Sequence, residues 1–279
     1  MAKLETIDAV PILSNWYGPD SIACHTVRII SSEEAESEFT VGSNLCGPLA
    51  RPPMFNRLTF QNGVLTTQTS AEDAREHFIK SVGISVVPGH NIMGFVAEGL
   101  GLVYNNQDAT IYVNGFDFMR FRGLILPGQE MKCSGEVDKI GESVLATLVM
   151  SLQRRPFTRN FCVEMGETLD VQERQKFLQQ HWIFEANAQG LGMLGLAAAR
   201  EGIVPVLMEV GRSTFNKIPV LAGNVLRSHF TNVLVDEEQI SGDAKTYVGE
   251  KLVAEQQNLI LQLVPIDDIK QTTEGIRVL

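Results

Sequence analysis

The chain is short of positive charge and has no long apolar run. Its 279 residues include 23 Lys and Arg against 33 Asp and Glu, which gives a net charge of −10. Such a surface repels phosphates, which argues against a nucleic-acid-binding protein. No apolar run approaches the ~20 residues that span a bilayer, and the first ten residues lack the apolar core of a signal peptide. We therefore expect a cytoplasmic protein that binds neither nucleic acid nor membrane.

Cysteine is also scarce, and the four that occur are widely scattered. They are Cys24, Cys46, Cys133 and Cys162. None forms a Cys-x-x-Cys pair or stands at ligand spacing from a histidine, so we expect no metal site. A disulfide framework is not expected in so long a chain with so few cysteines. Nothing in the sequence indicates a cofactor.

Apolar spacing and turn signals divide most of the chain into two stretches with the same order of elements. Each has a strand, a Gly-rich apolar helix and then a series of strands. The expected helices are Asn91–Asn105 and Gln172–Arg200. The expected strands lie at 23–30, 38–41, 54–60, 64–69, 109–119, 124–126, 129–138, 143–153, 161–165, 204–216, 220–221, 224–235, 242–248 and 251–264. Because the Gly-rich helices carry apolar residues all round, we expect them to be buried, with their glycines letting strands pack close.

Two segments repeat in detail. Phe121–Gly128 and Phe215–Gly223 each place an aromatic residue seven or eight positions before a glycine, and each precedes a long strand. Their starts are 215 − 121 = 94 residues apart, whereas solenoid repeats have periods of about 20–50 residues. The sequence therefore predicts a duplicated α+β domain. Two such units can pair their sheet edges within one chain, so we expect a monomer with a pseudo-dimeric core. Association of two such chains into a homodimer stays open.

The same segments resemble a known family. Phe121–Gly128 is similar to the Phe-x-x-x-Val-x-Pro-Gly segment of hot-dog-fold β-hydroxyacyl-thioester (acyl carrier protein) dehydratases, and Phe215–Gly223 matches it with one extra residue and Ala222 for Pro. Glu185 followed by Gln189 resembles the helix motif of that family, and Met54–Leu58 resembles its opening strand. The resemblance covers roughly residues 50–265.

The resemblance implies a double hot dog, in which two long buried helices are each wrapped by a curved antiparallel sheet. We expect an N-terminal extension at 1–49, a first unit at 50–157, and a second unit with a C-terminal tail at 158–279. In this family a neutral imidazole removes the α-proton of a 3-hydroxyacyl thioester and a carboxylic acid protonates the leaving hydroxide. Backbone N–H groups at the start of a buried helix hold the thioester oxygen. The histidine comes from one unit and the acid from the other.

Glu185 is the best candidate for the acid. It shares a helix face with Gln189 at four-residue spacing, so the amide can orient the carboxyl group. The alternative interpretation of Glu185 is a solvated helix carboxylate. Glu98 is the second candidate, because it falls on the family's acid when Pro88–Met93 is laid on the Pro-Gly-x-Pro-Ile-Met run of the family.

His77 is the first candidate for the base. The spacing from His77 through Gly83 to Pro88 resembles the His-x-x-x-Gly-x-x-x-x-Pro motif of double-hot-dog dehydratases, with the histidine two residues early. His90 is the rival, beside Gly89 at the start of the first expected helix, where both residues present N–H groups suited to the thioester oxygen. A surface histidine and a helix cap are the alternative interpretations. His181, four residues before Glu185, resembles the histidine that precedes the acid in this family.

The resemblance favours a lyase that dehydrates 3-hydroxyacyl groups carried by acyl carrier protein or coenzyme A (CoA), in fatty-acid or polyketide-type biosynthesis. Two alternatives stay open, because fold alone does not choose among them. One is an acyl-thioester hydrolase or acyltransferase/decarboxylase on the same fold. The other is a non-catalytic protein that binds an acyl carrier or another partner.

Overall fold

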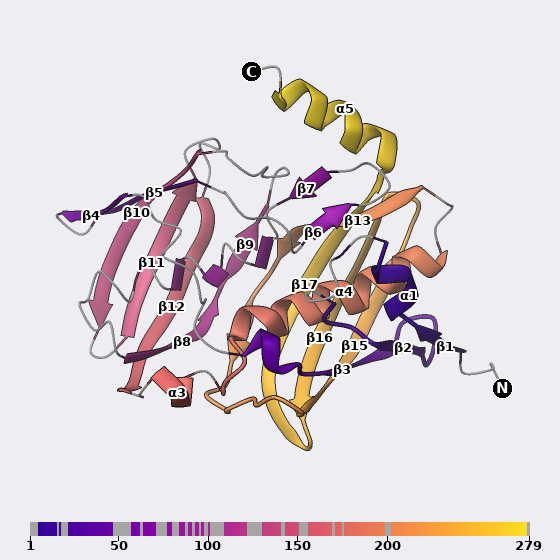
Figure 1. Ribbon diagram of the computed structural model, residues 1–279, viewed down its shortest axis with the longest axis horizontal. Coiled ribbons are helices and arrows are strands. Elements are labelled where there is room, and N and C mark those ends of the chain that lie inside the picture. Colours follow the sequence, from indigo (N-terminus) through magenta and orange to yellow (C-terminus); the bar gives the residue numbers. More distant parts are fainter. Residues whose placement is uncertain are drawn as a thin grey trace.

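The computed structural model places most of the chain in extended segments. It describes residues 5–15, 17, 22–46, 57–61, 64–70, 77–79, 84–86, 89–90, 93–94, 96–97, 100, 109–121, 130–140, 143–150, 156–168, 171–174, 176–198 and 202–277. All strand pairs among them are antiparallel. The described part of the chain is therefore an antiparallel sheet with few helices (Figure 1).

Fifteen strands of the described residues form one sheet, in the order β1-β2-β3-β15-β16-β17-β13-β9-β12-β11-β10-β5-β4, with β8 and β14 paired alongside. The N-terminal strands are β1 (Glu5–Asp8), β2 (Thr26–Ile29) and β3 (Ala35–Thr40). The middle of the chain contributes β4 (Arg57–Gln61), β5 (Val64–Ser70), β8 (Ala109–Phe116), β9 (Phe118–Arg120), β10 (Glu130–Ile140), β11 (Ser143–Met150) and β12 (Pro156–Thr168). The last part contributes β13 (Ile203–Val210), β14 (Ser213–Phe215), β15 (Val225–Val235), β16 (Gln239–Val248) and β17 (Lys251–Pro265). A separate hairpin consists of β6 (His77–Ile79) and β7 (Ile84–Val86).

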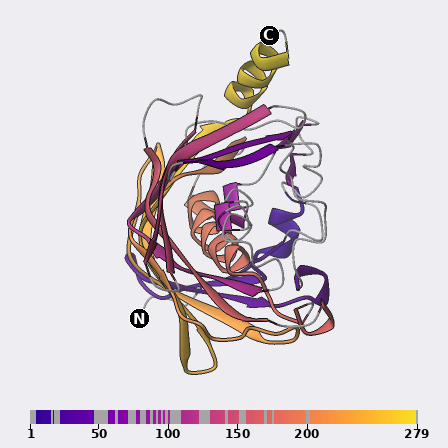
Figure 2. The same ribbon diagram turned by 90° about the vertical axis from the view of Figure 1, so that its left-hand side faces the viewer.

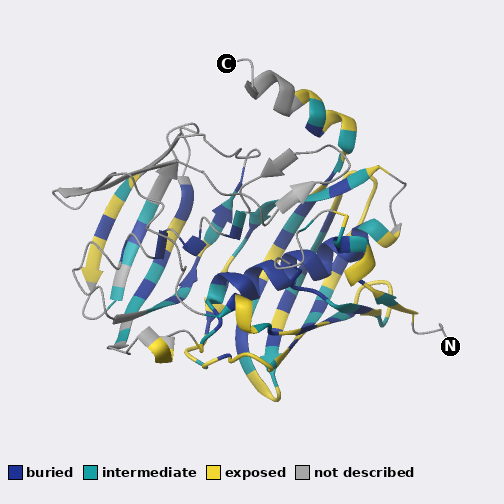
Figure 3. Cartoon of the chain, in the orientation of Figure 1, coloured by how far each residue is buried: buried dark blue, intermediate teal, exposed yellow. Residues whose placement is uncertain are grey.

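One long helix, α4 (Gln180–Ala198), lies against the concave side of the second half of this sheet (Figure 2). It contacts β13, β15, β16 and β17 from that half and β2 and β3 from the N-terminal segment. Every residue from His181 to Gly195 is buried, as the dark blue helix in Figure 3 shows. This confirms the expectation of a buried, Gly-rich helix in the second stretch of the chain.

The glycines of α4 are the points at which the sheet comes closest. A Cβ atom at Gly190 would lie 2.8 Å from the ring of Phe230 and 2.8 Å from the hydroxyl of Ser37. A Cβ atom at Gly195 would lie 3.0 Å from Leu263. The lack of side chains at these positions lets the strands approach the helix backbone, which accounts for glycines that would otherwise weaken a helix.

The two halves of the chain share the sheet, as the duplication predicted. β9 pairs with β13, and β8 pairs with β14, so the sheet continues from one half to the other within a single chain. The first residue of α4 adds a further link. The Gln180 amide accepts a hydrogen bond from the Val113 N–H at 2.7 Å and donates one to the Val113 carbonyl at 3.1 Å. Gln180 thereby fixes the start of α4 to β8.

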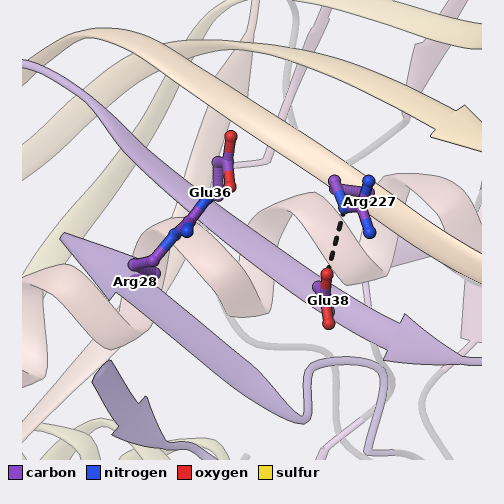
Figure 4. A network of polar contacts seen from close by, with 4 residues as sticks. All are labelled: Arg28, Glu36, Glu38 and Arg227. Carbon is purple, nitrogen blue, oxygen red and sulfur yellow. Dashed lines mark hydrogen bonds and ion pairs between the residues drawn. The ribbon is translucent and has the colours of Figure 1, made fainter. Parts of the chain in front are cut away.

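The N-terminal segment extends the sheet of the second half. β2 pairs with β3, and β3 pairs with β15. On these strands Arg28 pairs with Glu36, and Arg227 Nε lies 3.0 Å from Glu38 Oε1 (Figure 4). Such exposed ion pairs contribute little free energy. The attachment of this segment therefore rests mainly on the backbone ladder and on buried residues such as Phe39.

The helix expected at Gln172–Arg200 begins later in the structure than the sequence analysis predicted. Residues 171–174 form a separate turn, α3 (Val171–Arg174), and α4 begins at Gln180. Between them, Phe177 forms an isolated bridge with Leu221, and the Leu178 N–H donates to the Val220 carbonyl at 2.8 Å. These backbone groups are committed to neighbouring segments, so a helix cannot use them.

The ends of the described chain carry two helices that the sequence analysis did not predict. The short α1 (Val10–Leu13) follows β1, and α5 (Ile266–Arg277) follows β17 at the C-terminal end. In the first half, the described residues at 89–90, 93–94, 96–97 and 100 are helical and together are called the first-half helix below. Among the helices that the structure describes, none combines the length and hydropathy needed to cross a bilayer.

Candidate functional site

Four polar side chains from the two halves of the chain meet in the interior. His90 comes from the first-half helix, and His181, Glu185 and Gln189 come from α4. The α4 residues follow at four-residue intervals and therefore lie on one helix face. Their exposed fractions are 0% for His90, 3% for His181, 5% for Glu185 and 2% for Gln189. The alternative interpretation of Glu185 as a solvated carboxylate is therefore wrong.

The backbone of the N-terminal segment fixes the orientation of Gln189. The Ala23 N–H donates a hydrogen bond to Gln189 Oε1 at 2.7 Å. A backbone N–H group can only donate, so the oxygen of the Gln189 side chain must face Ala23. Its nitrogen then faces Glu185, and Gln189 Nε2 donates to Glu185 Oε1 at 2.8 Å. Gln189 thus holds one carboxyl oxygen of Glu185 and leaves the other directed elsewhere.

The other carboxyl oxygen of Glu185 faces a histidine of the opposite half. Glu185 Oε2 lies 4.0 Å from His90 Nε2. This pair joins a group from the first-half helix with one from α4, which is the arrangement that the family resemblance implies for a base and an acid. A carboxyl group and an imidazole at this separation can both reach one small group placed beside them.

A second histidine, His181, contacts the His90 ring at Nδ1, the ring nitrogen other than the one that faces Glu185. His90 Nδ1 lies 2.8 Å from His181 Nδ1, and His181 Nε2 lies 2.7 Å from Gln179 Oε1. The indole of Trp182 packs against His90 at a ring-centroid distance of 4.6 Å. Burial lowers the pKa of His181 to about 3, so this imidazole is neutral at ordinary pH.

Together these contacts form one polar line through the interior. It runs from Ala23 through Gln189, Glu185, His90 and His181 to Gln179. The Glu185–His90 separation of 4.0 Å is the only step in this line that exceeds hydrogen-bond length. The widest gap in this line therefore lies between Glu185 Oε2 and His90 Nε2.

Tyr17 and Cys24 flank the site, and the sequence analysis did not predict either of them there. Loss of water around the phenol, followed by the negative charge of Glu185 and then by Cys24, raises the pKa of Tyr17 well above its ordinary value. Burial raises the pKa of Cys24 to about 12. Both groups therefore remain protonated at ordinary pH. No spacing in the sequence links them to Glu185, because only the fold brings the N-terminal segment to α4.

The other candidates have different outcomes. His77 lies in β6, where its backbone pairs with Val86, and its side chain is outside the described residues. Glu98 is also outside the described residues. Gly89 is helical and adjoins Phe121, whose ring would lie 3.3 Å from a Cβ atom at that position. The region of Phe121–Gly128 beyond Phe121 is outside the described residues.

Groups of three or more His, Cys, Asp or Glu side chains suited to a metal ion do not occur in the described part of the chain. The site chemistry that the residues offer is proton transfer by an imidazole and a carboxyl group.

Comparisons with known proteins give structural neighbours but no sequence relatives. No protein-family model matches the chain, and no curated protein sequence is similar to it. Two structures of the PpsC dehydratase domain from Mycobacterium tuberculosis are each 9% identical and are covered over 99% of their length. The one in complex with C12:1-CoA covers 76% of this chain at a TM-score of 0.47, and the other covers 77% at 0.48. The dehydratase domain from the CurK module of Curacin polyketide synthase is 10% identical, with 77% of this chain and 98% of that domain covered at a TM-score of 0.42. All three structures are described as dehydratase domains.

Proposed function

We propose that this protein is a dehydratase (lyase) that acts on 3-hydroxyacyl thioesters carried by acyl carrier protein or CoA. The observation that carries the proposal is the buried pair of His90 and Glu185, with Nε2 and Oε2 4.0 Å apart. In this account the chain is a double hot dog, with units at 50–157 and 158–279 and an N-terminal extension at 1–49. The site lies between the two units.

The first step is removal of a proton from C2 of the substrate. The bare Nε2 nitrogen of neutral His90 takes this proton, and the electron pair of the C–H bond moves toward the thioester carbonyl. Backbone N–H groups at the start of the first-half helix, at Gly89 and His90, stabilise the charge that develops on the thioester oxygen.

The second step is departure of the hydroxyl group from C3. For this step Glu185 has to carry a proton on Oε2, which it gives to this oxygen as the C3–O bond breaks, so a water molecule leaves and a double bond forms between C2 and C3. The two carbons are bonded neighbours, which is why the base and the acid must lie close together. His90 then holds the proton from C2, and Glu185 is a carboxylate. Transfer of that proton across the short His90–Glu185 gap restores both groups.

The environment of the pair suits this chemistry. Gln189 keeps Glu185 Oε1 occupied, so Oε2, which faces His90, is the oxygen available for proton transfer. Burial of both side chains keeps bulk water away from them, which strengthens hydrogen bonds and charge interactions in the site.

Intact-mass measurement of acyl carrier protein loaded with a 3-hydroxyacyl group, before and after incubation with the protein, tests the proposal. Loss of one water supports dehydration. Loss of the whole acyl group or of carbon dioxide would replace the proposal with a hydrolase or a decarboxylase. An unchanged mass with carrier and CoA thioesters of several chain lengths would favour a non-catalytic binding protein.

Four variants, one of them a control, identify the residues in the same assay. We expect Glu185→Gln and His90→Asn to lower turnover by roughly 10²–10⁴-fold, because each removes a proton-transfer group and keeps a similar shape. His229→Asn, on the partly exposed side of β15, is the control and should retain wild-type turnover. If His77→Asn lowers turnover by this amount and His90→Asn retains wild-type turnover, the base is His77 and not His90.

A further inference from the structure

The two buried histidines share a single hydrogen bond between like nitrogens. His90 Nδ1 and His181 Nδ1 lie 2.8 Å apart, and the two rings are inclined by only 19°. A neutral imidazole carries one N–H donor and one bare acceptor nitrogen. One of the two Nδ1 atoms must therefore carry a proton and donate the hydrogen bond, and the other must be unprotonated and accept it.

The neighbour of His181 decides which nitrogen is the donor. Gln179 Oε1 lies 2.7 Å from His181 Nε2, and an amide oxygen only accepts hydrogen bonds. His181 Nε2 therefore carries a proton. Because burial keeps the pKa of His181 near 3, the ring holds only this one proton. His181 Nδ1 is then bare and accepts, and His90 Nδ1 must be the donor.

We propose that His181 and Gln179 are positioning residues that hold His90 in the tautomer with its proton on Nδ1 and its lone pair on Nε2, the atom that faces Glu185. This proposal rests on the proposed function for its catalytic meaning and deepens it, because it specifies how the base is prepared. The geometry thus places the bare nitrogen of His90 beside Glu185, where a C2 proton can be taken next to the acid.

The same contact also suits the protonated form of His90. When His90 has taken a proton on Nε2, its Nδ1–H continues to donate to His181, so the ring does not have to turn during the reaction. Among the described residues, Glu185 on α4 faces His90, and the charge of Glu185 in turn acts on Tyr17 of the N-terminal segment, which also interacts with Cys24. A neutral His181 accepts this bond without adding a second positive charge to a buried site, which would oppose protonation of His90.

The tautomer can be observed directly by NMR with histidine labelled by ¹⁵N, since protonated and bare ring nitrogens resonate at different frequencies. For the wild-type protein at neutral pH we expect His90 to show a protonated Nδ1 and a bare Nε2, and His181 to show the reverse. The signals are assigned by their disappearance in His90→Asn and His181→Asn. A protonated Nε2 on His90 in the wild type would overturn the proposal.

Two variants of His181 separate positioning from packing. Asn has an amide oxygen near the position of Nδ1 and can still accept, whereas Phe keeps the ring and removes the acceptor. We expect His181→Phe to mix the two tautomers of His90 and to lower kcat about tenfold with little change in KM, and His181→Asn to retain the wild-type spectrum and most of the rate. Equal spectra and equal kcat values for the two variants would overturn the proposal.

Gln179→Leu gives a second measurement if His181→Phe does not fold. Removing the Gln179 acceptor frees His181 to change its tautomer, so the His90 signals should again show a mixture. A His90 spectrum identical to that of the wild type would show that Gln179 does not set the tautomer. The NMR readout needs no substrate. If the wild type shows the expected tautomer and dehydrates no 3-hydroxyacyl thioester, the proposed function fails and the tautomer proposal stands.

Discussion

A buried polar cluster beneath α4 offers a test of how this helix is held on the sheet. Asn187 donates to Gln256 Oε1 at 2.6 Å and accepts from Ser228 Oγ at 2.5 Å, and it also contacts Thr246 Oγ1 at 2.9 Å. The exposed fractions of these four residues are between 0 and 2%. Since residues 185 and 187 lie on opposite sides of a helix with 3.6 residues per turn, the cluster sits behind Glu185.

Asn187→Leu replaces the side chain with an apolar group of similar size. Gln256 Oε1 then loses its hydrogen bond from Asn187, and Gln256 Nε2 already has no hydrogen-bond partner among the described residues. Ser228 keeps its 3.0 Å contact with Thr246. A buried polar atom left unsatisfied costs about 1–3 kcal/mol, so we expect the free energy of unfolding to fall by about that amount. For a chain of this size that corresponds to a drop in Tm of roughly 2–12 °C.

The double variant Asn187→Leu with Gln256→Met is the matched control. Replacing both partners with apolar groups of similar shape is nearly neutral, because no buried polar atom of the pair is left unsatisfied. Urea unfolding followed by circular dichroism should therefore show that the second substitution restores most of the stability lost in the first. A loss below about 0.5 kcal/mol in the single variant, or a simple sum of two losses in the double variant, would refute this reasoning.

Three further predictions concern stability. Gly190→Ala places a Cβ atom 2.8 Å from Phe230 and from Ser37 and should lower the free energy of unfolding by about 1–3 kcal/mol in urea titrations; an unchanged value would contradict the close approach of α4 to the sheet. Gln180→Leu removes both hydrogen bonds to the Val113 backbone and should cost about 1–3 kcal/mol, whereas no loss in the same titration would show that this link between the halves is dispensable. In the folded protein the pKa of His181 is lowered from 6.5 to about 3, so between these pH values the unfolded chain binds a proton that the folded chain does not. The free energy of unfolding of the wild type should therefore fall as the pH drops through that window. His181→Phe should lose less stability than the wild type between pH 7 and pH 4, and an equal loss would contradict burial of a neutral His181.

The α4 part of the site could be predicted from the sequence because it is local. His181, Glu185 and Gln189 follow at four-residue spacing, and helix geometry alone places them on one face. The first-half contribution depended on the duplication, which put the start of the first helix near the second helix in space. The choice between His77 and His90 could not be made from spacing, because it depends on which ring lies beside Glu185.

The remainder of the site depends on contacts between distant parts of the chain. The hydrogen bond from the Ala23 N–H to Gln189 joins residues 166 positions apart, and no local pattern predicts it. The start of α4 was misjudged for a similar reason. Residues 172–179 are compatible with a helix by composition, but the backbone of Leu178 bonds to Val220, and this tertiary contact overrides local propensity.

The most direct test of the account separates the proton taken by His90 from the proton given by Glu185. A 3-hydroxyacyl thioester is incubated in D₂O with the wild type and with each variant, and mass spectrometry follows deuterium at C2 and the loss of water. We expect the wild type to release water, and Glu185→Gln to exchange the C2 hydrogen while releasing water at least roughly 100-fold more slowly. His90→Asn should do neither. Exchange at C2 by His90→Asn at the rate of Glu185→Gln would contradict the account, because a group other than His90 would then take the C2 proton.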